Sequence, residues 1–188
     1  VAPITAVACA TLPVIWGLFS GEKLSTQQVI GVFVGLFAIF LVSWTPGEQA
    51  SIKGMLVVEA LIAGLAFGAF FIVIDGTSET TAPWPVVGSR VFSVAAIFLF
   101  VLIGRKNIKP KGNSTPYIIG AGFFDTLANV VLLAALNRGM LSLVSVLASF
   151  YPAVTVLLAR VFLKEMMLKS QIVGLALGLT SIALLAVS

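Results

Sequence analysis

Apolar residues form seven long runs along the chain, separated by short polar connections. Each run is about 20 residues long, the length that a helix rising 1.5 Å per residue needs to cross about 30 Å of hydrocarbon. Because backbone groups in lipid must be hydrogen-bonded within their own segment, such runs are predicted to be helices and not open sheets. The predicted spans are 2–20, 26–44, 54–75, 84–104, 116–136, 141–163 and 168–187. We therefore expect an all-α, multi-pass membrane protein.

Composition supports this expectation and excludes several function classes. The 188 residues are 60% hydrophobic and 10% charged, far from the balance of a soluble domain. The net charge of +4 comes from residues flanking the apolar runs and not from one exposed cluster, so no nucleic-acid partner is expected. There is no His and a single cysteine, Cys9, so no catalytic residues, metal site or cofactor are predicted. The partners we expect are membrane lipid and a small-molecule substrate.

Two sets of polar and small residues recur with the same spacing, 143 residues apart. One set joins the first two spans and the other joins the last two. The first helix of each pair carries a proline, Pro13 or Pro152, where we expect a helix break. The first and sixth spans are an odd number of crossings apart, so they run in opposite directions, as in an inverted-topology repeat. The matched residues are Glu22 and Glu165, Gln28 and Gln171, Gly31 and Gly174, and Gly35 and Gly178.

The repeat predicts a domain organisation. If residues 47–188 are one complete five-helix unit, residues 1–46 are the last two helices of another. We therefore expect a ten-helix (5+5) inverted-repeat bundle, with three further N-terminal helices of the same protein before Val1 as partners of this portion.

At this point the sequence resembles a known family. The segment PAVTVLLARVFLKE (152–165), followed by Gln171 and Gly174, is similar to the end of an EamA domain, the repeat of the drug/metabolite transporter superfamily. Residues 141–152 and Arg90 near the start of the fourth span fit the same pattern. The resemblance implies a ten-helix carrier in the bacterial cytoplasmic membrane. Such a carrier would move a small metabolite, commonly exporting an amino acid or related compound, by alternating access.

The distribution of Lys and Arg and the family resemblance predict opposite orientations of the chain in the membrane. Eight Lys or Arg residues lie on the side that holds the start of the first span and three on the other, so the positive-inside rule places the first side in the cytoplasm. A family member with both termini cytoplasmic would instead place Ser188, on the second side, inside.

Asp125 is the leading candidate for function, because an ionisable residue at membrane depth costs about 2.5 kcal/mol or more. It lies near the middle of the fifth span, and Asn129 follows one turn later on the same face. The pair could bind an ammonium group, or Asp125 could take up a proton in a coupling cycle. The alternative is an interhelical hydrogen bond, for example near Thr126 or to a serine of the sixth span.

Other candidates lie nearer the membrane edges or at a helix break. Arg90 either pairs with Asp75 or Glu79 or receives a substrate carboxylate. Glu59 either lines a cavity mouth or extends to the interface. Pro152 frees a backbone carbonyl in the sixth span, so Ser149 and Tyr151 beside it either line a site or pack at an ordinary kink.

Two further groups of residues are expected to be structural. Glu22 and Glu165 are expected to anchor helix–helix turns. Four G-x-x-x-G pairs are expected to mark helix packing, beginning at Gly17, Gly31, Gly64 and Gly174.

Other function classes remain open at this stage. No phosphate-binding loop occurs, so transport would be driven by the substrate gradient or by protons. An intramembrane enzyme would have to use the only two aspartates, Asp75 and Asp125, which lie at different depths. A retinal-type receptor would need a lysine within the last span, where Lys169 lies only at the mouth. A non-transporting structural subunit is the remaining alternative.

Overall fold

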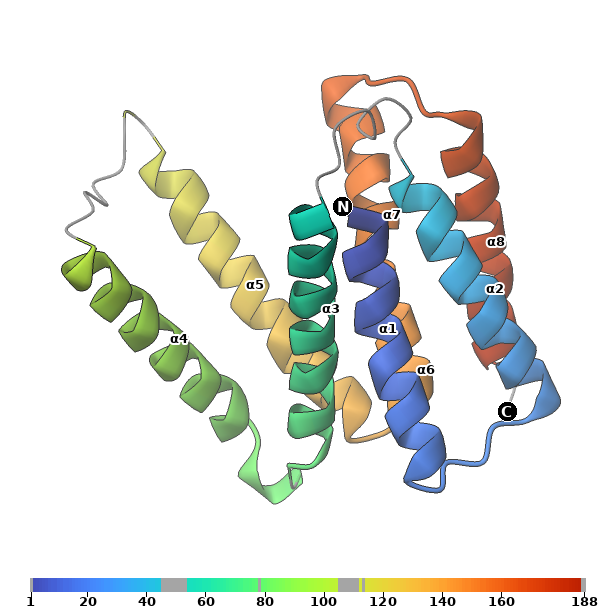
Figure 1. The fold of residues 1–188 in the computed structure, drawn as a ribbon, viewed down its shortest axis with the longest axis horizontal. Helices are drawn as coiled ribbons and strands as arrows, with labels where there is room; N and C mark the ends of the chain where they lie inside the picture. The colour runs from blue at the N-terminus through green and yellow to red at the C-terminus, as the bar shows by residue number, and fades with distance from the viewer. Residues whose placement is uncertain (1, 45–53, 78, 105–111, 113, 187–188) are drawn as a thin grey trace. The chain divides into compact units, whose positions relative to one another are not determined.

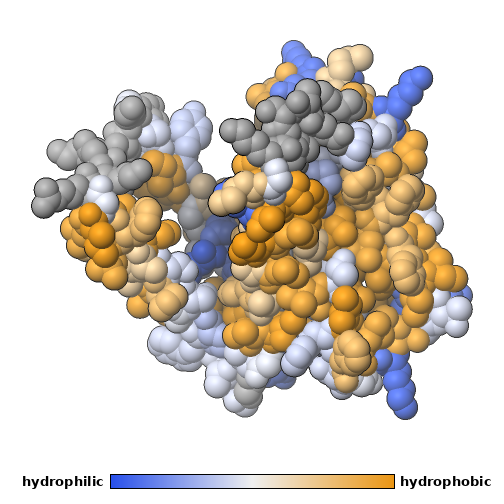
Figure 2. Space-filling view, viewed as in Figure 1, coloured by the Kyte–Doolittle hydropathy of each residue, from blue (hydrophilic) through white to orange (hydrophobic). Residues whose placement is uncertain are grey.

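The computed structural model describes residues 2–44, 54–77, 79–104, 112 and 114–186, and within this part the chain is helical (Figure 1). Seven segments of the described chain are long and apolar enough to cross a membrane, as the hydrophobic pattern predicts. The helices are α1 Ala2–Phe19, α2 Thr26–Ser43, α3 Gly54–Asp75, η2 Glu79–Thr81, α4 Trp84–Ile103, α5 Thr115–Leu136, α6 Leu141–Ala148, α7 Tyr151–Leu158, η3 Ala159–Leu163 and α8 Lys169–Ala186. Apolar side chains cover much of the helix surface in Figure 2, as expected for contact with lipid.

The sixth span is broken near its middle, as Pro152 predicts, whereas the expectation of a break at Pro13 was wrong, since α1 continues through it. α6 ends at Ala148 and α7 begins at Tyr151, with Ser149 and Phe150 between them. Proline has no N–H and its ring crowds the preceding turn, so the helix cannot continue unchanged through this point. The last turn of the span, Ala159–Leu163, is a π-helix.

The described residues divide into two compact units, residues 1–73 with 139–188, and residues 74–138. In the first unit α1, α2, α6, α7 and α8 surround one core, and most of its members are small or β-branched, which lets the helices approach closely. The buried members are Ala6, Ala10, Val14, Val32, Ala38, Ile39, Val42, Val146, Phe150, Ala153 and Leu185.

The packing of α2 against α8 is reciprocal. A Cβ added to Gly31 of α2 would lie 2.9 Å from Leu185 Cδ2, and a Cβ added to Gly174 of α8 would lie 2.7 Å from Val42 Cγ2. Leu185 follows Gly174 by the same 11 positions by which Val42 follows Gly31. Each helix therefore packs a glycine against a branched residue of the other at corresponding positions. The two helices run side by side in opposite directions (Figure 1).

The glycine pairs behave as packing positions, with one exception. Gly64 and Gly68 of α3 face α1, where added Cβ atoms would meet Thr5 and Cys9 carbonyl oxygens at 2.5 and 3.0 Å. The expectation was wrong for Gly21, which lies in a turn after α1 with φ +95° and has open space around it. A positive φ strains residues that carry a Cβ, so Gly21 serves the turn and not helix packing.

The second unit contains α4 and α5 packed against one another. Its buried apolar residues in the described part are few: Ile74 at the end of α3, Val86 on α4, and Leu133 and Leu136 on α5. Two parts of the sequence interpretation lie outside the described residues: the domain boundary expected between 46 and 47, and the basic stretch 105–111 used for orientation.

Candidate functional site

An ion pair joins the two helices of the second unit. Arg90 Nη2 of α4 lies 2.6 Å from Asp125 Oδ2 of α5, and the same nitrogen lies 3.4 Å from the Asp125 carbonyl oxygen. Arg90 is in the second turn of α4 and Asp125 is near the middle of α5. The partner expected for Arg90 was Asp75 or Glu79; the ion pair that the structure shows is with Asp125 on the neighbouring helix.

Asn129 completes a small polar cluster, as the one-turn spacing predicts. Its side-chain amide donates to the Asp125 carbonyl oxygen at 2.7 Å. This bond fixes the amide beside the carboxylate, but it leaves the carboxylate itself bound to Arg90. The Arg90 Nε–H is buried and has no hydrogen-bond partner in the described structure. One donor of the guanidinium is therefore unsatisfied at this site.

The pair is partly open to its surroundings. The side chains of Arg90 and Asp125 are 35% and 58% exposed. Within a membrane segment, opposite charges that neutralise each other avoid the full cost of a lone charge in hydrocarbon. A ligand carrying both charges could replace each partner without leaving either side chain unpaired. The cluster is therefore suited chemically to a small zwitterion.

The other predicted acid in a span, Glu59, stands apart from such a cluster. It is exposed on α3, and no ion pair is formed by it within the described residues. This arrangement fits a side chain extending toward the membrane edge better than a binding group.

The broken helix carries a buried face of serines. Ser142, Ser145 and Ser149 are fully buried at helical spacing, and Ser149 lies beside the buried thiol of Cys9. Ser142 and Ser145 have oxygen hydrogen-bond partners, whereas the Ser149 hydroxyl has beside it in the described part of the chain only the weakly hydrogen-bonding thiol of Cys9. Tyr151 differs from these serines, because it is half exposed and Phe150 takes the buried position instead. Of the two predicted residues at the break, Ser149 faces the interior of the first unit and Tyr151 its surface.

Glu22 makes the contact that sequence reasoning did not anticipate. Its carboxylate accepts hydrogen bonds from the backbone N–H of Leu141 at 2.5 Å, from the backbone N–H of Ser142 at 3.1 Å, and from the Ser142 hydroxyl. These N–H groups begin α6 and have no partner within their own helix. The expectation that Glu22 anchors a turn thus understates its role. The local motif around Glu22 gives no sign of this contact, because the partners lie 119 and 120 positions away in the sequence.

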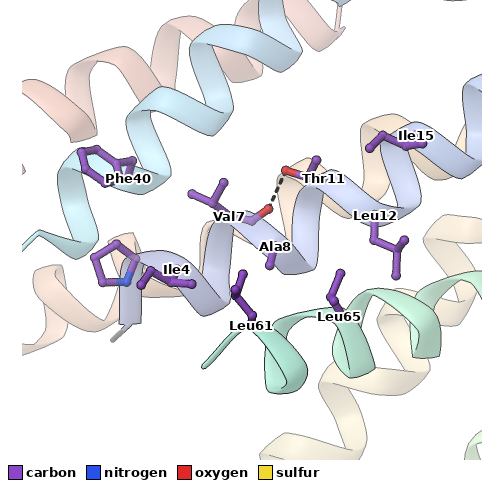
Figure 3. Close-up of a pocket in the computed structure, with 10 residues that line it drawn as sticks. Ile4, Val7, Ala8, Thr11, Leu12, Ile15, Phe40, Leu61 and Leu65 are labelled. Carbon is purple, nitrogen blue, oxygen red and sulfur yellow. Dashed lines mark hydrogen bonds between the residues drawn. The ribbon is translucent and has the colours of Figure 1, made fainter. Parts of the chain in front are cut away.

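A separate groove lies in the first unit between α1, α2 and α3 (Figure 3). It encloses about 460 Å³, and apolar side chains such as Val7, Leu12 and Phe40 line it. Its one side-chain hydroxyl, that of Thr11, already donates to the Val7 carbonyl oxygen at 2.7 Å (Figure 3). The groove therefore has no polar group to orient a charged or polar metabolite.

These features define a multi-pass helical membrane protein with an ion pair inside its spans. A family model described as the EamA-like transporter family matches residues 53–187. An uncharacterized protein of Methanocaldococcus jannaschii is 30% identical over 141 residues, which are 75% of this chain and 98% of that protein. No solved structure matches. The chain belongs to the EamA-like transporter family, as the residues of the sixth and seventh spans indicate.

Proposed function

We propose that the protein is a secondary transporter that moves a small zwitterionic metabolite, an amino acid or a related compound, across the cytoplasmic membrane. The observation that carries the substrate class is the pairing of Arg90 with Asp125 at 2.6 Å inside two membrane-spanning helices. Membership of a transporter family supports the general activity. Export is the direction that the family resemblance favours.

In this proposal the substrate binds by replacing each partner of the Arg90–Asp125 ion pair with its own oppositely charged group. The substrate carboxylate takes the place of Asp125 on the guanidinium, which binds carboxylates through two parallel hydrogen bonds. The substrate ammonium takes the place of Arg90 on the Asp125 carboxylate, beside the Asn129 amide. Each charge stays neutralised throughout, so binding avoids a lone charge at membrane depth. When the pair separates without substrate, Asp125 is the group able to accept a coupling proton.

Alternating access requires two related halves, and the reciprocal glycine contacts support an inverted repeat. Gly31 against Leu185 and Gly174 against Val42 are related by the 143-residue offset found in the sequence. The proposed cycle is a rocking of the two repeats around the substrate.

Thermal unfolding of the full-length protein in detergent tests the proposal. The probes are an L-amino acid, the matching amine without its carboxylate, and the matching acid without its amine. Ligand at 100 times its dissociation constant stabilises by about 2.7 kcal/mol, a shift of several degrees. We expect the amino acid alone to give this shift in the wild type, and Asp125→Asn and Arg90→Gln to lose it.

A matched control uses another acid of the same unit. Glu79→Gln should keep the full shift, because Glu79 lies in the short helix before α4 and not in the pair. If Asp125→Asn and Arg90→Gln also keep it, the pair is structural and the proposed substrate class is wrong.

A further inference from the structure

The turn that joins the last two membrane-spanning segments carries three cations. Arg160 lies in the π-helix that ends the sixth span, Lys164 directly follows this helix, and Lys169 begins α8. All three are exposed, as is Glu165, the one acid of this stretch. None of the four forms an ion pair within the described residues. Three positive charges and one negative leave residues 160–169, which we call the basic turn, with a net charge of +2.

The backbone of the basic turn holds the first cation close to the second. Arg160 Nη1 donates to the carbonyl oxygen of Glu165 at 3.2 Å. Because Glu165 directly follows Lys164, the guanidinium is held at the backbone beside this lysine. The bond uses one N–H of the five that a guanidinium carries, so the group can donate to a further acceptor.

The cations are not needed to build this turn, because an equivalent turn lacks them. Residues 17–26 correspond to residues 160–169 at an offset of 143, with Glu22 in the place of Glu165. Each turn is followed by a Gln side chain that accepts a backbone N–H at 2.9 Å. The positions of the three cations are occupied in the first turn by Gly17, Gly21 and Thr26.

The position of Lys164 is one that glycine would occupy more easily. Lys164 has φ +56°, and its counterpart Gly21 has φ +95°. Residues with a Cβ adopt such values at a cost, whereas glycine adopts them freely. A lysine at position 164 therefore brings backbone strain to the turn, which indicates a use for its charge.

Large apolar side chains alternate with the cations. Phe162, Leu163 and Met166 are 76%, 69% and 85% exposed. The turn from η3 to α8 lies between two segments that are long enough to cross a membrane, at one end of both (Figure 1), so it lies at the edge of the hydrocarbon layer. At this depth apolar side chains enter the acyl layer while Lys and Arg extend to the headgroups.

We propose that the basic turn binds the phosphate group of an anionic phospholipid. Its net positive charge complements a headgroup with net negative charge, and its apolar side chains contact the acyl chains of the same lipid. Each Lys or Arg near an anionic membrane surface strengthens binding about fivefold, so three cations together contribute about 100-fold. This role is separate from the substrate pair on α4 and α5.

Lipid-dependent thermal unfolding of the full-length protein in neutral detergent tests this proposal. The probes are phosphatidylglycerol and, separately, phosphatidylcholine with the same acyl chains. We expect the anionic lipid alone to raise the melting temperature, by several degrees near saturation. Lys164→Gln combined with Lys169→Gln should raise the lipid concentration at the midpoint of this shift about 25-fold. Each single substitution should raise it about fivefold, so the test does not depend on the folding of the double variant.

Two matched variants separate charge at this turn from other effects. Lys23→Gln combined with Arg138→Gln removes two exposed cations from other turns and should keep the wild-type midpoint. Lys164→Arg combined with Lys169→Arg keeps both charges and should also keep it. Equal shifts by the two lipids, or an unchanged midpoint in the glutamine variants of Lys164 and Lys169, would overturn the proposal. An equal shift by glycerol phosphate at the same concentration would assign the turn to free phosphate and would also overturn it.

Discussion

The carboxylate of Glu22 accepts a hydrogen bond from the backbone N–H of Leu141 at 2.5 Å, across 119 positions of sequence. The bond ties the turn between α1 and α2 to the first turn of α6. Gly17 makes room for it, since a Cβ there would lie 2.5 Å from the Ser142 hydroxyl oxygen. One acid thus joins two hairpins of helices that are far apart in the chain.

Neutralising Glu22 should destabilise the protein. Hydrogen bonds to a charged group contribute about 1.5–3 kcal/mol, and a lost helix cap about 1 kcal/mol. We expect Glu22→Gln to lower the free energy of unfolding by about 2 kcal/mol, measured by chemical denaturation in detergent. Lys23→Gln, an exposed neighbour, serves as the control and should change stability by less than about 0.5 kcal/mol. Equal effects of the two substitutions would contradict the cap.

Enlarging Gly174 should separate α8 from α2. An added Cβ would lie 2.9 Å from the Val42 backbone nitrogen and 3.0 Å from the Ala38 carbonyl oxygen, and backbone atoms cannot move aside as a side chain can. We expect Gly174→Ala to cost about 1–3 kcal/mol. Gly120→Ala on α5 has open space around its Cβ and should be neutral or gain up to about 1 kcal/mol in helix propensity. A stable Gly174→Ala protein would show that the helices do not pack this closely.

Two serines of the broken helix should respond differently to removal of the hydroxyl. Ser142 donates to Glu22, so Ser142→Ala should cost about 1 kcal/mol. The buried Ser149 hydroxyl has beside it only the thiol of Cys9, a weak hydrogen-bonding group, so Ser149→Ala should cost less than Ser142→Ala. Melting temperatures of the two variants give the comparison. An equal or larger loss for Ser149→Ala would contradict this difference between the two hydroxyls.

Hydrophobic run length predicted the membrane spans well, because the bilayer imposes a length on every helix that crosses it. The break in the sixth span could be predicted from Pro152, because the missing N–H of a proline is visible in the sequence without knowledge of the packing. The π-helix at Ala159–Leu163 was not predicted, since no residue type there requires it. Gly21 was misassigned because G-x-x-x-G spacing does not distinguish a helix from the turn that ends it.

The site was predicted in part. Asp125 and Asn129 are one turn apart on one helix, so their proximity could be foreseen from spacing. The partner of Arg90 could not, because it depends on which helix packs beside α4 and at what register. The Glu22 contact was missed for the same reason. Long-range partners depend on which helices pack together and at what register, and local spacing along the chain does not reveal this.

Exchange of labelled amino acid in proteoliposomes tests the central claim most directly. The full-length protein would be compared with Asp125→Asn, Arg90→Gln and the double variant, which removes both charges of the pair. The double variant leaves no lone charge in the membrane, so it should fold as the wild type does. We predict counterflow by the wild type and none by the double variant despite its normal melting temperature. Counterflow restored in the double variant would show that the pair only holds α4 to α5, and would contradict its role in binding substrate.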